Sequence, residues 1–340
     1  MSRNQAAARS MMMMLLVVAL ACSPGGASDD LPERLDRVTA VVLPYMTHMP
    51  FHIARAEGFF ADEGLEVEFL RMGRSQEFMS ALATGEVDVT TGMLAANELN
   101  LIASGARVRA VAAMAELAAD GCTFVGLIGR AELLESGVMD SPEAIGGLVV
   151  DTDLTTPLGF LTDRFLASRG ATIDDVALVN VPPPAALDAL PSGAIDITIE
   201  AEPFVSQHLQ RGASLLATGQ ELAPGYNQSV MLFGRRLLDE RPELGERFAR
   251  AVLRGVEQFA EGRTARNMEI VAQASGQLPE ILERACWPLA PAGANLDTRG
   301  IRAYQAWAMQ RGMLDRVLED DELVDRRFFP GDSASTGEAR

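Results

Sequence analysis

The chain has 340 residues, of which 48% are hydrophobic and 22% are charged, and its formal net charge is −18. This length is sufficient for two domains that each bury a core of their own. Such acidity argues against nucleic acid or an anionic membrane surface as a partner. All 29 residues counted as lysine plus arginine are arginine, because the sequence contains no lysine.

The N-terminus has the pattern of a bacterial lipoprotein signal. Two arginines precede an apolar run over 11–21, which is too short to span a bilayer and is typical of the hydrophobic region of a signal peptide. The run ends in Ala-Leu-Ala before Cys22, which resembles the lipobox, whose cysteine is diacylated. We predict a signal peptide over 1–21 and a lipidated Cys22 on a flexible tether over 22–37. An ordinary secretory signal with an incidental cysteine is the alternative.

Apolar β-branched runs alternate with amphipathic stretches from residue 38 onward. The first cycle predicts, in chain order, strand 38–43, helix 51–57, strand 65–70, helix 76–84, strand 87–91, helix 94–104 and strand 108–114. The second cycle predicts strand 123–128, a short helix at 141–143, strand 148–151, helix 157–168, strand 176–181, helix 185–190, strand 195–199, helix 203–210 and strand 214–218. The remainder predicts strand 230–233, helices 244–261, 265–274, 279–285 and 298–311, and a disordered tail over 331–340.

This regular alternation predicts an α/β fold with mostly parallel sheets and helices on both faces. A ten-residue phrase occurs twice, as A-L-A-T-G-E-V-D-V-T over 81–90 and as A-L-P-S-G-A-I-D-I-T over 189–198. In each copy we expect the glycine to end a helix in the left-handed conformation and the aspartate to start the next strand. Two copies indicate two similar lobes, each leading a strand toward a shared cleft.

We expect lobe one to comprise 38–120 and 221–330, with lobe two inserted over 121–220 and the last helices returning to lobe one. Ligands of open α/β sheets bind beyond the carboxyl ends of the strands. Two facing lobes therefore place two sets of strand ends around one cleft.

Motifs in both lobes resemble the substrate-binding proteins of ABC importers, in the subfamily that handles sulfonates, taurine, nitrate and thiamine-pyrimidine precursors. They are P-F-H-I-A over 50–54, G-F-F-A-D-E-G-L-E-V over 58–67, the two repeated phrases, S-P-E-A-I-G-G over 141–147, and Glu202-Pro203. The stretch 141–147 departs from the family's S-P-A-D-L-K-G-K by its second glycine and its missing lysine. The resemblance extends from about residue 38 to residue 329.

The resemblance implies a two-lobed periplasmic-binding-protein fold, type II-like, with a hinge between the lobes and no chemistry on the ligand. It implies a small-molecule ligand, an ABC permease and ATPase complex as partner, and no cofactor. We expect an exported monomer in the periplasm or at the cell surface, tethered to the membrane through Cys22.

The candidate ligand contacts are residues that follow predicted strands or begin helices near the expected cleft. In lobe one they are Tyr45, Thr47, His48, Met49, Arg74, Ser75, Gly92 and Met93. In lobe two and on the hinge side they are Asp153, Thr155, Thr156, Glu200, Glu202, Tyr226 and Asn227. Helix capping is an equal alternative for the two threonines of lobe two, and a solvated loop is one for Tyr45.

Glu200 and Glu202 place two carboxylates near the cleft, which suit an amine or amidine and repel a sulfonate or nitrate. We therefore predict a nitrogenous, neutral or cationic ligand, pyrimidine-like or amine. Arg74 near the cleft mouth keeps an anionic ligand as the alternative. His48 and His52 are four residues apart, but Pro50 starts a helix between them, so we predict no metal site.

Cys122 and Cys286 remain once Cys22 is assigned to lipid. An exported protein can oxidise them to a disulfide, but their distance in sequence leaves the geometry open, and two separate buried thiols are the favoured prediction.

An enzyme is the main competing function. A pyrimidine synthase of this fold holds a pyridoxal cofactor through a lysine Schiff base, which a chain without lysine cannot form. The motifs of serine hydrolases, zinc proteases and P-loop proteins are also absent from the sequence. A lipoprotein of the same fold used as a sensor or scaffold is the third hypothesis.

Overall fold

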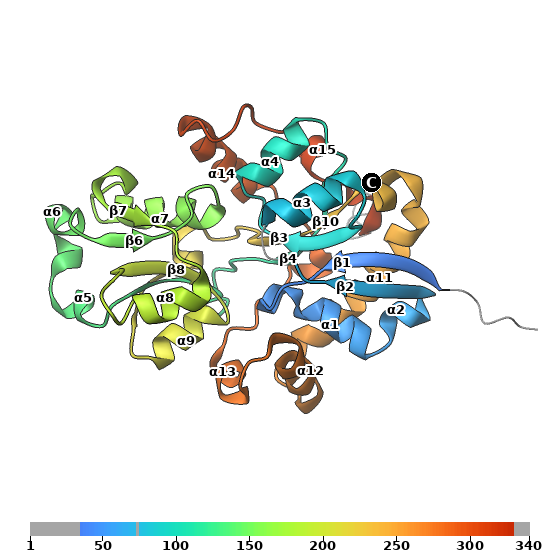
Figure 1. Ribbon diagram of the computed structural model, residues 1–340, viewed down its shortest axis with the longest axis horizontal. Helices are drawn as coiled ribbons and strands as arrows, with labels where there is room; N and C mark the ends of the chain where they lie inside the picture. Colours follow the sequence, from blue (N-terminus) through green and yellow to red (C-terminus); the bar gives the residue numbers. More distant parts are fainter. Residues whose placement is uncertain (1–34, 73–74, 330–340) are drawn as a thin grey trace, which may run out of the picture. The chain divides into compact units, whose positions relative to one another are not determined.

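The computed structural model describes residues 35–72 and 75–329 (Figure 1). The predicted signal peptide, Cys22, Arg74 and the predicted tail over 331–340 lie outside the described residues. The described chain contains two five-stranded mixed sheets, each covered by helices, so the predicted α/β fold with two lobes is confirmed.

The first sheet has the strand order β2-β1-β3-β10-β4. Its strands are β1 (Asp36–Val41), β2 (Leu65–Leu70), β3 (Val89–Gly92), β4 (Arg109–Ala115) and β10 (Ser229–Phe233). β1 pairs in parallel with both β2 and β3, whereas β10 runs antiparallel to β3 and β4. Four strands therefore share one direction, and the reversed strand is the one that returns from the second sheet.

The second sheet repeats this topology in the order β7-β6-β8-β5-β9. Its strands are β5 (Val125–Gly129), β6 (Val149–Asp151), β7 (Ala177–Val179), β8 (Ile197–Ala201) and β9 (Ser214–Thr218). Here β5, the first strand to enter the sheet, is the reversed one. All five strands lie between β4 and β10 in the chain, so the second lobe is an insertion in the first.

Helices from both ends of the chain cover the first sheet (Figure 1). They are α1 (Met49–Ala56), α2 (Phe59–Asp62), α3 (Ser75–Thr84), α4 (Ala96–Ala103), α11 (Pro242–Ala260) and α12 (Ala265–Ser275). The phenyl rings of Phe60 and Phe248 stack at 5.1 Å between α2 and α11, and Phe51 and Phe233 pack against Phe248. These buried rings fix the C-terminal α11 against the N-terminal α1 and α2.

The second lobe and the last part of the chain hold shorter helices. The second lobe has α5 (Glu132–Glu135), α6 (Pro142–Ile145), α7 (Pro157–Ser168), α8 (Pro183–Ala189), α9 (Phe204–Gln210) and α10 (Gly219–Leu222). The chain ends with α13 (Pro279–Arg284), α14 (Arg299–Gln310) and α15 (Asp320–Leu323). Single turns complete the fold at η1 (Met46–His48), η2 (Val138–Asp140), η3 (Ile173–Asp175), η4 (Arg236–Glu240), η5 (Ala292–Ala294) and η6 (Arg326–Phe328). The other four-residue helices were not predicted, because one turn has no hydrophobic periodicity to detect; α6 was predicted at 141–143 from its N-cap serine and the proline that follows.

The two copies of the repeated phrase occupy equivalent places before β3 and β8, the central strands of their sheets. Gly85 and Gly193 have φ of +86° and +76°, so the predicted left-handed helix ends are confirmed. Asp88 and Asp196 precede their strands by one residue, as predicted.

The two aspartates also make equivalent bonds. Asp88 Oδ2 accepts the backbone N–H of Thr39 at 2.8 Å, and Asp196 Oδ2 accepts that of Val149 at 2.8 Å. Each aspartate is also paired with an arginine that follows the reversed strand, at 2.7 Å for Arg236 and 2.6 Å for Arg130. The repeated aspartate is therefore a structural residue that joins three strands at the end of the sheet away from the cleft.

Cys122 and Cys286 form a disulfide with a Cα–Cα distance of 5.5 Å. The prediction of two separate thiols is therefore wrong. The fold brings together residues 164 positions apart, because the segment between β4 and β5 passes beside the C-terminal segment after α13.

Candidate ligand-binding cleft

A cavity of about 370 Å³ lies at the carboxyl ends of strands from both sheets. From the first lobe it is lined by Leu43, Tyr45, Thr47, His48, Met72, Phe78, Met79, Thr90, Thr91, Gly92, Met93, Ala95, Glu98, Gln228, Ser229 and Leu232. From the second lobe it is lined by Phe124, Asp151, Thr152, Asp153, Thr156, Leu158, Asn180, Val181, Pro183, Ile199, Glu200 and Ala201. Its size and its largely apolar walls suit a small organic molecule.

The loop after β1 supplies an aromatic and an imidazole side chain. His48 Nδ1 accepts the backbone N–H of Leu43 at 3.2 Å, and burial lowers the pKa of this histidine to about 3. The imidazole is therefore neutral, with its proton on Nε2. The Tyr45 ring meets Phe204 of the second lobe edge-on at 6.1 Å, and burial, followed by the charge of Glu200, raises the pKa of the Tyr45 hydroxyl.

Polar side chains of β3 and of the approach to β10 form the floor on the first lobe. The hydroxyls of Thr91 and Ser229 are hydrogen-bonded at 3.1 Å, and Gln228 Nε2 donates to Met93 Sδ at 3.0 Å. Among the described residues, Gln228 Oε1 has no hydrogen-bond partner. This floor can therefore offer both donors and acceptors.

Glu200 is the central acidic group of the second lobe. Its side chain is 4% exposed, and burial, followed by the nearby Asp151, raises its pKa well above the usual value. Asp151 is held by structural bonds, since Oδ1 accepts the N–H of Val181 and Oδ2 the hydroxyl of Thr198, both at 2.8 Å. Burial therefore favours the protonated form of Glu200, in which the carboxyl group can both donate and accept a hydrogen bond.

The N-terminus of α7 reaches the cavity through Thr156 and Leu158. Thr156 caps the helix, because its hydroxyl accepts the N–H of Leu158 at 3.2 Å. Asp153 lines the cavity while its Oδ1 accepts the N–H and hydroxyl of Thr155 at 2.9 and 2.7 Å. Thr156 therefore caps the helix, as one alternative predicted, and also lines the cavity.

Charge in the cavity lining has one sign. The described lining residues include four with carboxyl groups and none with a guanidinium group.

In the described part of the chain, no cluster of three or more His, Cys, Asp or Glu is arranged to hold a metal ion, and no helix is long and apolar enough to cross a bilayer.

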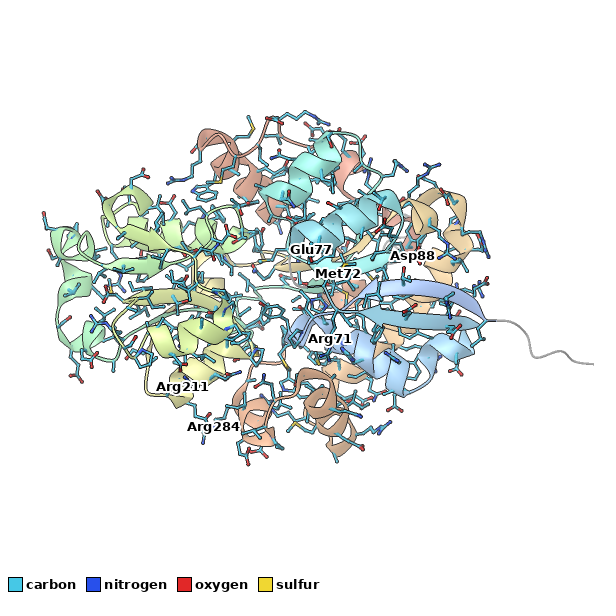
Figure 2. All side chains as sticks on the ribbon, viewed as in Figure 1. Arg71, Met72, Glu77, Asp88, Arg211 and Arg284 are labelled. Atoms are coloured by element: carbon cyan, nitrogen blue, oxygen red, sulfur yellow. A yellow bond between two sulfur atoms is a disulfide. The ribbon has the colours of Figure 1, made fainter. Side chains whose placement is uncertain are left out.

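Eight predicted residues line the cavity: Tyr45, Thr47, His48, Gly92, Met93, Asp153, Thr156 and Glu200. Met72, labelled in Figure 2, is a lining residue that was not predicted, whereas Asp88, labelled on the same lobe, lies before β3 at the opposite end of that strand. The side chains of Arg74 and Ser75 are not described, and Ser75 is placed only as the first residue of α3.

Five predicted residues do not line this cavity. Met49 is fully buried in the core of the first lobe. Glu202 Oε1 accepts the Ser206 hydroxyl at 2.8 Å and the Cys286 N–H at 2.9 Å, so its carboxyl group joins structural elements. Thr155 has its hydroxyl engaged by Asp153.

The two hinge-side residues are engaged elsewhere. Tyr226 packs against Gly300 at the start of α14, and Asn227 Oδ1 accepts the N–H of Asp297 at 2.7 Å. Both are buried beneath the C-terminal segment rather than in the cleft.

Sequence reasoning missed several polar lining residues for two reasons. Asp151 and Asn180 follow β6 and β7 at their carboxyl ends, so the strand-end rule could have found them. Gln228 and Ser229 lie at the amino end of β10, which reaches the cleft only because this strand is reversed. Strand direction is a tertiary property that the local pattern does not contain.

The two sheets of like topology and the cavity at their strand ends define the two-lobed fold of periplasmic binding proteins. The chain belongs to the NMT1-like family, whose sequence model matches residues 32–275. A search of curated proteins finds no match for the chain.

Solved structures share the fold at low sequence identity. The ligand-binding component of an ABC-type import system from Staphylococcus aureus, with zinc bound, has a TM-score of 0.71 and 14% identity over 88% of this chain and 100% of that chain. The alkanesulfonate-binding protein SsuA from Xanthomonas axonopodis pv. citri, bound to MOPS, has a TM-score of 0.66 and 18% identity over 86% and 98%. The desulfurization enzyme DSZB has a TM-score of 0.62 and 15% identity over 86% and 97%. The fold therefore serves both binding proteins and an enzyme.

Proposed function

We propose that this protein is an exported solute receptor that captures a small nitrogenous molecule between its two lobes and delivers it to an ABC import permease. The observation that carries the proposal is the cavity between the strand ends of both sheets, with Glu200 buried in its wall. A ligand that contacts both lobes binds the closed state better than the open one, which is how such a receptor signals occupancy.

The chemistry of Glu200 favours a neutral heterocycle that carries an amino group. A protonated carboxyl group donates through its O–H and accepts through its carbonyl oxygen, so it pairs at two points with a ring nitrogen beside an amino group. This refines the expectation from sequence, in which two carboxylates attract a cation, because Glu202 is turned away and burial favours the neutral form of Glu200. Glu200 still accommodates a cationic amine if it releases that proton on binding.

A sulfonate or nitrate anion is the second candidate ligand. The N-terminus of the 12-residue helix α7 lines the cavity and favours negative charge. The structural relatives include a protein named for alkanesulfonate binding. The carboxyl groups of the described lining oppose this candidate.

Catalysis is disfavoured by the available side chains. In the described part of the chain both cysteines are joined in the disulfide, so the cavity presents no thiol nucleophile. The absence of lysine also rules out a Schiff base anywhere in the chain. Binding without chemistry, by a protein that is exported and anchored through Cys22 and acts as a monomer, is the role we propose. The lobe boundaries at 120/121 and 220/221 are part of this proposal.

The test is a thermal-shift screen followed by calorimetry on aminopyrimidines, amines, alkanesulfonates and nitrate. We expect an amino-substituted heterocycle to bind at micromolar concentration and to raise the melting temperature. Micromolar binding of an alkanesulfonate or nitrate, with no binding of nitrogenous compounds, would overturn the ligand class. Failure of all four classes to bind would favour a sensor or scaffold.

Two variants separate the modes of recognition by Glu200. Glu200→Gln keeps a donor and an acceptor, so a neutral heterocycle should bind within a few-fold of wild type, whereas a cation should lose about tenfold or more. Glu200→Leu removes both hydrogen bonds and should weaken either ligand. Equal affinity of wild type and Glu200→Leu would exclude Glu200 from the site.

A further inference from the structure

We propose that residues 276–329, here named the C-terminal strap, hold the two lobes together from two sides and thereby limit how far the binding cleft opens. The whole strap lies beyond the stretch 32–275 that matches the family. The inference goes beyond the proposed function and does not depend on the identity of the ligand.

The strap is anchored in the first lobe. Asn100 Nδ2 in α4 donates to the backbone oxygen of Met313 at 2.8 Å, and the N–H of Asp325 donates to Ala110 O in β4 at 2.9 Å. The indole of Trp287 stacks on Phe259 of α11 at 4.9 Å. These contacts fix both halves of the strap to elements of the first sheet.

On one side of the cleft the strap packs against α7 of the second lobe and is hydrogen-bonded to it. Trp307 Nε1 in α14 donates to Asp163 Oδ2 at 2.7 Å, and Arg311 donates to the same oxygen at 3.2 Å. Phe160 of α7 packs against the Tyr304 and Trp307 rings at 6.2 and 5.8 Å. The contact thus combines aromatic packing with a charged hydrogen bond, which is stronger than a neutral one.

Helix α14 also contacts the loop that lines the cavity. The hydroxyl of Tyr304 donates to the backbone oxygen of Thr155, in the loop between β6 and α7. That oxygen also accepts the N–H of Ala96 from the first lobe at 2.9 Å. Tyr304 is therefore a positioning residue, since it orients the acceptor of a hydrogen bond that crosses from one lobe to the other.

On the other side the strap is tied to the second lobe covalently and by hydrogen bonds. Cys286 is joined to Cys122 in the crossing between β4 and β5, and its N–H donates to Glu202 Oε1 of the second lobe at 2.9 Å. Gln207 Nε2 in α9 donates to Gln277 Oε1 at 3.0 Å. This is why Glu202, expected in the cleft, is found outside it.

Rotation of the lobes about the crossing segments leaves the disulfide intact and must break the contacts between the strap and α7. In a receptor without them, closure draws only on the ligand's differential affinity for the closed state. Here contacts that involve no ligand contribute to closure as well. We infer that the ligand-free protein is held largely closed, and that ligand exchange requires release of the strap.

Hydrogen exchange at the Ala96 amide tests the proposal directly. Ala96 is the first residue of α4, so its N–H has no acceptor within the helix and is protected only by Thr155 O across the cleft. In the double variant Tyr304→Phe/Trp307→Phe we expect this amide to exchange about tenfold or more faster. We also expect the radius of gyration by solution X-ray scattering to increase.

Trp287→Phe is the matched control. Trp287 Nε1 donates to Leu282 O within the strap itself, so the substitution loses an indole hydrogen bond that does not cross the cleft. The phenylalanine keeps an aromatic ring against Phe259, so the anchor to the first lobe is retained. Exchange at Ala96 should stay within about twofold of wild type. The full-length chain is used throughout, and circular dichroism verifies that each variant is folded.

The outcomes decide the proposal. Slow exchange in wild type and Trp287→Phe, with fast exchange in the double variant, supports it. Equal exchange in all three, or exchange in wild type at the rate of an exposed amide, overturns it. If the double variant does not fold, Cys122→Ser/Cys286→Ser provides the same measurement from the other side, and unchanged exchange there counts against the strap.

Discussion

The two copies of the repeated phrase are alike at one end of their strands and different at the other. At the end away from the cleft, Asp88 and Asp196 make the same bonds to a neighbouring strand and to an arginine. At the cleft end, Gly92 of the first lobe stands where Glu200 stands in the second. Repetition therefore preserves the residues that join strands, whereas the residues that face the ligand diverge.

The neighbouring strands show the same divergence. Val41 of β1 pairs with Thr90, and Asp151 of β6 pairs with Thr198 at the equivalent position. The second lobe therefore has Asp151 and Glu200 at the positions where the first lobe has the uncharged Val41 and Gly92. The lining of the cavity is accordingly asymmetric, although the topology of the two sheets is repeated.

The largest expected effect comes from removing the aspartate that both copies of the repeated phrase share. Asp88→Ala and Asp196→Ala each remove the acceptor of a strand N–H and the partner of an arginine, with the aspartates 2% and 9% exposed. We expect each to lower the free energy of unfolding by about 2–4 kcal/mol, measured by urea denaturation. Asp188→Ala, whose ion pair with Arg211 is exposed, should cost less than about 0.5 kcal/mol. A large loss in only one lobe would contradict their equivalence.

The pH dependence of stability tests the environment of Glu200, at the cleft end of β8. Burial raises the pKa of Glu200 above 4.5, so the native protein keeps a proton that the unfolded chain releases. Stability from this group is therefore fully present below pH 4.5 and falls as the pH rises toward the native pKa. Glu200→Gln should remove this part of the decline, so the variant should gain on wild type between pH 4 and 8 in denaturation midpoints. Parallel profiles would show that Glu200 is not protonated in the folded protein.

Thr90 and Thr198 occupy equivalent positions in the two lobes, so substitutions there compare the lobes directly. Thr198 donates to the buried carboxylate of Asp151 at 2.8 Å, whereas Thr90 donates to Val41 O at 3.3 Å. We expect Thr198→Val to cost about 1–3 kcal/mol and Thr90→Val about 0.5–1 kcal/mol in thermal or chemical unfolding. Equal losses would mean that the carboxylate of Asp151 adds nothing to the hydrogen bond.

The smallest effect is expected at the glycines of the repeat. Gly85→Ala and Gly193→Ala place a side chain at positive φ with no atom within 4 Å, so only backbone strain is added. Each should cost about 1 kcal/mol in unfolding free energy. Gly92→Ala also meets open space but has no positive φ, and it should leave stability unchanged. A loss at Gly92 as large as at the other two would refute strain as the cause.

Much of the scaffold could be predicted because its determinants are local. The helix stops at Gly85 and Gly193 and the strands after Asp88 and Asp196 follow from residue types within one ten-residue phrase. The same phrase led from each strand to Gly92 and Glu200, which both line the cavity. Ligand clefts in α/β folds lie at the carboxyl ends of the strands, so a local pattern that locates a strand end also indicates where the cleft is.

The sequence by itself determined the two-lobed α/β architecture, the repeated aspartate bonds and eight of the residues that line the cavity, because hydrophobic periodicity, glycine stops and strand ends act over a few residues. Only the tertiary structure decided that β5 and β10 are reversed, that Cys122 meets Cys286, and that Glu202 serves a joint while Glu200 faces the cavity. Those outcomes depend on partners many residues away, and the burial that raises the pKa of Glu200 exists only in the folded protein.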